Sequence, residues 1–267
     1  MRKGTKAWLR NLLYYPMMAF CCLEIALRIL GYESFQNEDY SVKSSPENAF
    51  VGDATLGIRL NAGEYRTTVN GGLTFGATHL ATNSRLVVGN AKPDSSDVVF
   101  LGCSFTYGFG VNDGENFTSL LQNKFPKWNF QNAGVIGYGS VQSLLQLREL
   151  VEKQPLEAVV LNFSSFHFMR NTLSPQYRAN LKIGYGRSST NVENQMNEAK
   201  FPFKMACGNE IQQVSWSEIY ENWWGREWLA SVNWFQTSYD YFQEDLPKQI
   251  EITACILNEM NTICQEN

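Results

Sequence analysis

The sequence predicts an α/β fold in which parallel strands alternate with helices. Residues 98–101 form a short apolar run ended by Gly102, which is typical of a strand buried on both faces. Similar runs at 128–132 and 158–163 predict two further strands, and a helical pattern at 140–153 separates them. This alternation predicts a doubly wound parallel sheet whose first three strands lie in the order 2-1-3.

The helices of this region are predicted from their apolar spacing. The first is expected at about 115–125, with Asp113 near its N-cap and an apolar face made by Phe117, Leu120, Leu121 and Phe125. The helix at 140–153 carries Val141, Leu144, Leu145, Leu147 and Leu150. A third helix is expected from Asp245 and Pro247, carrying Ile250, Ile252, Ile256, Met260 and Ile263.

Three segments are predicted along the chain: a membrane or signal anchor at 1–32, an irregular leader with short strands at 33–96, and the α/β domain at 97–267. An insertion at about 172–245 holds most of the tryptophans, and helical texture is expected over 216–242. We expect its aromatic residues to pack against the core, although one wall of a binding cleft is an alternative. Since a helix in such a fold normally returns to a strand, we expect the α/β domain to be incomplete at the C-terminus.

The N-terminal segment predicts a membrane anchor. Arg2, Lys3, Lys6 and Arg10 precede an apolar run, and a helix over 8–30 would reach about 35 Å, enough to cross a hydrocarbon core of about 30 Å. Glu24 and Arg28 lie on one face and can pair near the far interface. The positive flank predicts a cytoplasmic N-terminus and an extracytoplasmic domain. The alternative is an amphipathic helix packed on the domain.

Composition excludes several other classes. The net charge of -4 comes from interspersed acids and bases, without a basic stripe, so we expect no nucleic-acid partner. Six cysteines show no Cys-x-x-Cys spacing and make no disulfide scaffold. Cys255 and Cys264 share a predicted helix about 13 Å apart and cannot bridge each other. We expect no metal and no cofactor.

Two glycine-rich turns follow consecutive predicted strands. Residues 102–108 read Gly-Cys-Ser-Phe-Thr-Tyr-Gly, which presents Ser104 at the carboxyl end of the sheet, where open α/β folds bind ligands. A serine there can attack a carbonyl, whereas a turn or cap role is the plainer alternative. Residues 132–140 form the second turn, in which Gly137 is placed to donate a backbone N–H.

With these turns the chain resembles the SGNH/GDSL hydrolases over roughly residues 97–171. That family's first block, Gly-Asp-Ser-x-(Ser/Thr)-x-Gly, is matched from Gly102 to Gly108 with Thr106 in place and Cys103 instead of Asp. The resemblance implies a flavodoxin-like sheet, Ser104 as nucleophile and an oxyanion hole from Ser104 and Gly137, with Asn132 in the second block. Residues 164–167 depart from the family's Gly-x-Asn-Asp. Together with Arg170 and Asn171, His167 looks like the corresponding block of membrane-linked bacterial members.

The family's last block, Asp-x-x-His, has no counterpart, since the two histidines are His79 and His167. His167 is a possible site residue, and contributing to binding or local hydrogen bonds is the expected role rather than that of general base. We interpret Cys103 as a small packed side chain. The resemblance implies an ester hydrolase or acyltransferase that acts on a small-molecule, glycan or lipid O-acyl ester. The alternatives are an inactive ligand-binding protein and a structural envelope protein.

Overall fold

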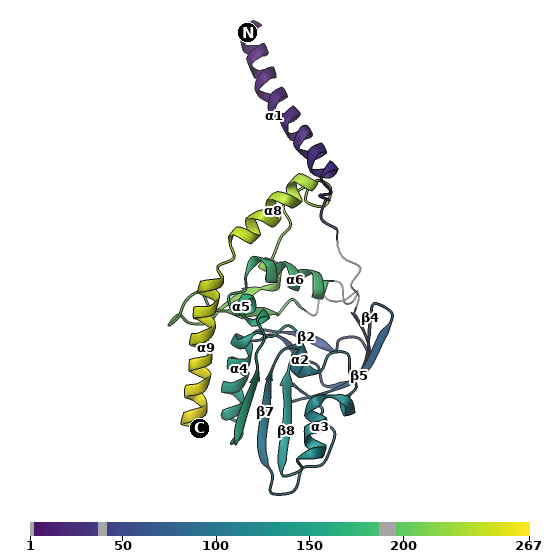
Figure 1. The fold of residues 1–267 in the computed structure, drawn as a ribbon, viewed down its shortest axis with the longest axis vertical. Helices are drawn as coiled ribbons and strands as arrows, with labels where there is room; N and C mark the ends of the chain where they lie inside the picture. The colour runs from purple at the N-terminus through teal and green to yellow at the C-terminus, as the bar shows by residue number, and fades with distance from the viewer. Residues whose placement is uncertain (1–2, 37–41, 187–195) are drawn as a thin grey trace. The chain divides into compact units, whose positions relative to one another are not determined.

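The computed structural model describes residues 3–36, 42–186 and 196–267, which fall into two compact units (Figure 1). The helical unit comprises residues 1–38 and 221–243. The sheet unit comprises residues 39–220 and 244–267. From residue 39 onwards the predicted leader therefore lies in the same unit as the parallel strands, and residues 221–243 of the predicted insertion lie in the helical unit.

A seven-stranded mixed sheet organises the sheet unit, so the chain has the predicted α/β character. Its strands follow the order β1-β4-β5-β6-β8-β7-β9. Their bounds are β1 Val42–Ser45, β4 Gly63–Val69, β5 Leu73–Leu80, β6 Ser84–Arg85, β7 Ser96–Gly102, β8 Trp128–Gly134 and β9 Ala158–Asn162.

The parallel half of the sheet consists of β8, β7 and β9. Because these are the second, first and third strands predicted from the apolar runs, the order 2-1-3 is confirmed. The register pairs Gly102 with both Gly134 and Asn162, so the three strands end level with one another. The segments that follow β7 and β8 consequently leave from the same edge of the sheet.

Helices cover both faces of the parallel strands. Val99 and Leu101 face α4 (Ser140–Val151) and α9 (Leu246–Glu266), where they join a core with Val141, Leu144, Leu147, Ile252, Ile256 and Met260. The alternate residues Val98 and Phe100 face α3 (Phe117–Lys124) and pack with Phe130, Phe117 and Leu121. This alternation explains why the strand reads as a continuous apolar run.

The three helices differ from the sequence predictions in detail. Asn116 rather than Asp113 caps α3, and its side chain accepts from the Thr118 N–H. Leu120 is 56% exposed, so the apolar face of α3 is narrower than predicted. Asp245 caps α9 as predicted, accepting from the Lys248 N–H at 3.0 Å.

The leader supplies the antiparallel half of the sheet. β4 pairs with β1 and β5, and β6 joins β8 through Arg85 and Asn132. Along β5 the buried residues alternate as Phe75, Ala77 and His79. Gly and Thr residues dilute this alternation in the sequence, and a histidine occupies a core position, so the strand pattern is weak. A separate hairpin, β2 (Phe50–Asp53) and β3 (Gly57–Leu60), completes this part.

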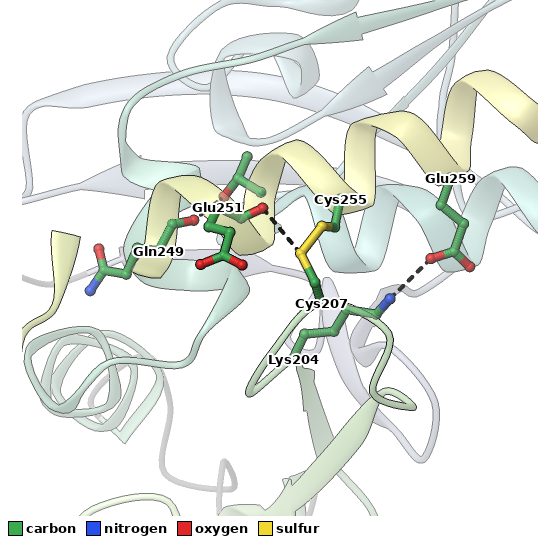
Figure 2. Close-up of a disulfide and its surroundings, with 7 residues drawn as sticks. Lys204, Cys207, Gln249, Glu251, Cys255 and Glu259 are labelled. Atoms are coloured by element: carbon green, nitrogen blue, oxygen red, sulfur yellow. Dashed lines mark hydrogen bonds and ion pairs between the residues drawn. A yellow bond between two sulfur atoms is a disulfide. The ribbon is translucent and has the colours of Figure 1, made fainter. Parts of the chain in front are cut away.

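α5 (Phe166–Asn171) lies just before the predicted insertion, within which α6 (Pro175–Gly186) precedes a hairpin of β10 (Lys200–Phe203) and β11 (Gln212–Ser215). Their core gathers Leu173, Tyr177, Leu181, Phe201, Trp216 and Ile219. A disulfide joins Cys207, after β10, to Cys255 on α9, with Cα atoms 5.8 Å apart (Figure 2). The predicted exclusion of a Cys255–Cys264 bridge is confirmed, since Cys264 is free.

The helical unit consists mainly of α1 (Lys3–Ile29) and α8 (Ala230–Phe242). Residues 11–29 of α1 are long and apolar enough to cross a membrane, and only 6% of that stretch is buried. Within the helical unit this stretch is therefore largely exposed, and the membrane anchor stays a prediction. The predicted pair on α1 is confirmed, with Arg28 Nε donating to Glu24 Oε1 at 2.7 Å.

Most tryptophans of the insertion contradict the prediction that they pack against the core. Trp216 does so and is 5% exposed. By contrast, Trp223, Trp224, Trp228 and Trp234 belong to the helical unit and are 44%, 83%, 65% and 37% exposed. The predicted helical texture over 216–242 also holds only in part, because α8 begins at Ala230 and a short 3₁₀ turn spans Trp216–Glu218.

Candidate active site

Ser104 lies where the sequence predicts, immediately after β7 at the start of the short helix α2 (Ser104–Tyr107). Its side chain is half-buried, whereas Cys103 before it is 1% exposed and Phe105 after it is 64% exposed. Among the described residues none is hydrogen-bonded to the Ser104 hydroxyl. The turn therefore presents an unengaged hydroxyl at the carboxyl edge of the parallel strands.

Two glycines let α2 pack directly on the ends of the strands. A Cβ on Gly102 would lie 2.3 Å from Thr106 Oγ1, and its φ of +150° is unfavourable for other residues. A Cβ on Gly134 would lie 2.4 Å from the Tyr107 backbone nitrogen and 2.6 Å from Thr106 Cβ. The approach of α2 to β7 and β8 thus requires glycine at both positions.

Thr106 and Asn132, predicted as possible site residues, lie beneath this turn and are fully buried. Asn132 Nδ2 donates to the Thr106 carbonyl at 2.8 Å, and Asn132 Oδ1 accepts from the Gly134 N–H at 3.1 Å. Thr106 Oγ1 donates to the Leu101 carbonyl at 3.5 Å. Both residues hold α2 against the sheet and do not reach the side on which Ser104 is exposed.

Arg85 fixes the far end of the turn. Its side chain is fully buried, and Nε donates to Asp113 Oδ1 at 2.7 Å. Its Nη1 donates to the carbonyls of Tyr107 and Gly108, and Nη2 donates to those of Gly76 and Val111, all within 2.9 Å. One side chain therefore links the end of α2 and the residues after it to β5.

Gly137 follows β8 and leaves the sheet at the same edge as Ser104, as predicted. It adopts a φ of +84°, which glycine permits. Its N–H donates no hydrogen bond within the described chain, and neither does that of Ser104 at the start of α2. The Gly137 carbonyl accepts from the Tyr177 hydroxyl of α6. That both N–H groups face one small cleft stays a prediction.

Aromatic and cationic side chains of α2, α5 and α6 lie beside these turns. The rings of Phe105 and Phe166 stack at 6.4 Å between centroids. The Arg170 guanidinium lies 5.6 Å from the ring centroids of both Phe166 and Tyr177, and its Nη1 donates to the Tyr138 carbonyl at 2.8 Å. Burial raises the pKa of Tyr177 to about 12, so its hydroxyl stays protonated and acts as a donor near neutral pH.

His167 does not meet Ser104. It is fully buried on α5, and its Nδ1 lies 3.0 Å from the Ser140 hydroxyl at the start of α4. Its Nε2 is buried without a hydrogen-bond partner among the described residues. Burial, aided by the nearby charge of Arg170, lowers the pKa of His167 from 6.5 to about 4. The local hydrogen bond predicted for His167 is present, and the ring is neutral near pH 7.

His79 and Cys103 are also internal. His79 is 2% exposed, and its ring nitrogens lie 2.8 Å from the Tyr107 hydroxyl and 3.1 Å from the Asn61 carbonyl. Burial lowers its pKa to about 4. The buried Cys103 is the packed side chain predicted from its position before Ser104. Neither residue exposes a reactive group beside Ser104.

Several residues that hold the turn in place are distant from it in the sequence, and the sequence did not predict their roles. Arg85 lies in a segment without clear periodicity, and no local pattern distinguishes it from a surface arginine. Tyr177 belongs to the insertion, which carries no recognised motif, and Phe166 lies in the block at 164–167 that departs from the Gly-x-Asn-Asp pattern. Asp113 was assigned as a helix cap, whereas it accepts from Arg85 and from the Thr78 N–H.

The chain is similar to solved structures of the esterase AlinE4, described as an SGNH-hydrolase family esterase. AlinE4 itself is 24% identical with a TM-score of 0.28, and the match covers 35% of this chain and 52% of that chain. Thus the chain spans about half the length of this structure. A mutant of AlinE4 is 16% identical with a TM-score of 0.27, covering 57% of this chain and 75% of that chain. No protein-family model and no curated protein matches.

Proposed function

We propose that the sheet unit is a serine ester hydrolase or acyltransferase that uses Ser104 as nucleophile. The observation that carries the proposal is the half-exposed, unengaged Ser104 hydroxyl on a turn that Gly102, Gly134 and Arg85 hold at the carboxyl edge of the sheet. Much of the local structure serves to fix this turn. Open α/β folds bind ligands at this edge.

In the proposed reaction the Ser104 oxygen attacks the carbonyl carbon of an O-acyl ester and forms a new C–O bond. The serine proton passes to solvent water, which returns a proton to the departing alcohol. The N–H groups of Ser104 and Gly137 stabilise the negative charge on the carbonyl oxygen. The ester C–O bond then breaks, the alcohol leaves with a proton, and acyl-Ser104 remains. Water completes hydrolysis, whereas a second hydroxyl completes acyl transfer. The proposed substrates are acyl esters of small molecules, glycans or lipids.

Covalent trapping tests this proposal. The full chain in detergent is incubated with an alkyl fluorophosphonate, and the adduct is located by intact-mass and peptide mass spectrometry. We expect one adduct on Ser104, and none in Ser104→Ala. Ser140→Ala is the matched control because Ser140 is fully buried and bonded to His167. A label at another serine, or no label on a folded chain, would overturn the nucleophile.

A non-catalytic protein of the same fold is the second candidate. It is favoured by the two histidines, because both are buried, neutral and bonded elsewhere. A serine without a base is weakly nucleophilic at neutral pH. In this case the edge around Ser104 binds an acylated ligand without cleaving it. Binding of a non-hydrolysable acyl amide, without fluorophosphonate labelling, distinguishes this candidate.

We further propose that α1 anchors the chain in a membrane and that the sheet unit lies outside the cytoplasm. The basic N-terminal flank supports this orientation, and the Cys207–Cys255 disulfide supports an oxidising compartment. We expect the full chain to stay in the membrane pellet after high-salt and carbonate washes. We also expect Cys207 and Cys255 to resist a maleimide reagent until a reductant is added. Recovery in the soluble cytoplasmic fraction would contradict the anchor.

A further inference from the structure

The helical unit exposes large aromatic side chains with few charges among them. Within residues 221–243 of this unit five are more than half exposed, and we name them the aromatic surface: Trp224, Trp228, Tyr239, Tyr241 and Phe242. α8 itself contains one charged residue, Asp240, in 13 positions. Exposed apolar surface of this extent marks a site that contacts something other than water.

The start of α8 is attached to α1 through an acidic residue. Glu24 Oε1 and Oε2 accept from the N–H groups of Ala230 and Ser231, each at 2.9 Å. These N–H groups belong to the first turn of α8 and have no partner within their own helix. The favourable position of a carboxylate at a helix N-terminus adds to this interaction. Arg28, which pairs with Glu24, also donates to the Trp228 carbonyl at 2.8 Å.

This attachment fixes the depth of the aromatic surface relative to α1. Glu24 lies five residues before Ile29, which is about 8 Å along a helix. The interfacial region on each side of a bilayer is about 5–8 Å thick. The start of α8 therefore lies at the level where the apolar stretch of α1 ends. Figure 1 shows α8 leaving the end of α1 sideways and not continuing along its axis.

We infer that the aromatic surface lies in the lipid headgroup region beside the end of α1, so that α8 is a second, interfacial membrane contact. Tryptophan and tyrosine favour this region because their rings are apolar with one polar group. The attachment of α8 to α1 also accounts for a charged residue near the end of an apolar helix. The Glu24 carboxylate accepts hydrogen bonds from the first turn of α8 and pairs with Arg28. The inference rests on the proposed membrane anchor.

The aromatic surface is continuous with the apolar stretch of α1, and this favours a lipid surface over a second protein chain as its partner. The aromatic surface includes Trp228, whose carbonyl accepts from Arg28 of α1, so it adjoins the stretch proposed to enter the bilayer. A groove beside it is lined by Tyr32, Trp234, Tyr241 and Phe242, which extends the aromatic character to the segment after α1.

Quenching by brominated lipids tests the inference on the full chain. The chain carries Trp8→Phe, which removes the tryptophan of α1, and is reconstituted in phosphatidylcholine–phosphatidylglycerol vesicles brominated near the top of the acyl chains. Four of the remaining tryptophans lie in the helical unit. The double variant Trp224→Phe/Trp228→Phe is expected to reduce the emission that the brominated lipid quenches to roughly half of its value in the parent chain. Trp128→Phe/Trp216→Phe, which changes two tryptophans of the sheet unit, is the matched control and is expected to leave it unchanged.

The outcomes separate this inference from the anchor. If the chain floats with the vesicles and only the Trp224/Trp228 variant loses quenching, the inference holds. If the chain floats but neither pair changes the quenching, α8 lies outside the bilayer or is covered by protein, and the inference is overturned while the anchor stands. If the folded chain does not float, the anchor fails and the inference fails with it.

Discussion

The turn that carries Ser104 and the helix that carries His167 differ in how they present their polar groups. Ser104 is half-exposed and unengaged on a turn fixed by Arg85, Asn132 and two glycines. His167 is fully buried, bonded to Ser140 and neutral near pH 7. The molecule thus positions a candidate nucleophile at the sheet edge and uses its histidine within the core.

The family motif combines two requirements of a serine esterase site, a positioned nucleophile and a base that accepts its proton, and the comparison separates them. Positioning of a nucleophile and stabilisation of an oxyanion depend on backbone geometry, and in the proposed site glycines and a buried arginine would fix that geometry. Proton transfer requires a base within hydrogen-bond reach of the hydroxyl, and neither histidine is bonded to Ser104. Variants that alter one part and leave the other intact test whether the parts are independent.

Loss of Arg85 is expected to have the largest effect on stability. Arg85→Met would break the buried ion pair with Asp113 and remove one hydrogen bond from each of four carbonyls, so we expect the free energy of unfolding to fall by about 3–5 kcal/mol. The control is Arg148→Met, which removes a half-exposed partner of Glu259 and is expected to cost at most about 1 kcal/mol. Urea unfolding of the detergent-solubilised chain measures both. Equal losses would contradict the role assigned to Arg85.

The neutral state of His167 predicts a pH dependence of stability. Its pKa is about 4 in the folded chain and 6.5 as the ordinary value, so the unfolded chain binds the proton more readily. The neutral ring of His167 therefore contributes up to about 3 kcal/mol to the free energy of unfolding. This contribution is present above pH 6.5 and is lost as the pH falls towards 4. His167→Gln should reduce the loss between pH 7 and pH 4.5 in urea unfolding. An unchanged pH dependence would show that His167 titrates normally.

A smaller effect is expected at the glycine beneath the turn. In Gly134→Ala the new Cβ meets the Tyr107 nitrogen and Thr106 Cβ, so α2 must move, at a cost of about 1–3 kcal/mol. Gly72→Ala is the control, because no atom lies within 4 Å of its Cβ position. Fluorophosphonate labelling of Ser104 should slow in the first variant and not in the second. Unchanged labelling in Gly134→Ala would show that the close packing of α2 on the strands does not control the reactivity of Ser104.

The parallel half of the fold follows from the sequence because its signals are local. The apolar run at 98–101, the glycines that end it and the apolar spacing of α4 each act over a few residues, and together they predict the order β8-β7-β9. The placement of Ser104 and Gly137 at one edge follows from the same pattern.

The remaining features depend on contacts between distant segments. Arg85 is 28 residues from Asp113, and nothing near it in the sequence marks it as buried. His79 and His167 occupy core positions in which each ring is hydrogen-bonded to a hydroxyl, of Tyr107 and Ser140 respectively, and sequence spacing does not reveal these partners. Trp224 and Trp228 are likewise exposed beside a helix, α8, whose start is hydrogen-bonded to Glu24 about 200 residues earlier. The expectation that these two tryptophans pack against the core was therefore wrong.

Ester turnover tests most directly the central claim that a positioned Ser104 acts without His167 as its base. Hydrolysis of p-nitrophenyl acetate is measured for the full chain, Ser104→Ala and His167→Gln, with folding checked by circular dichroism. Because a positioned base contributes about 10² to 10⁴ in rate, we expect slow turnover that Ser104→Ala removes and that His167→Gln leaves unchanged. Rapid turnover that His167→Gln abolishes in a folded chain would contradict the account and make His167 the base.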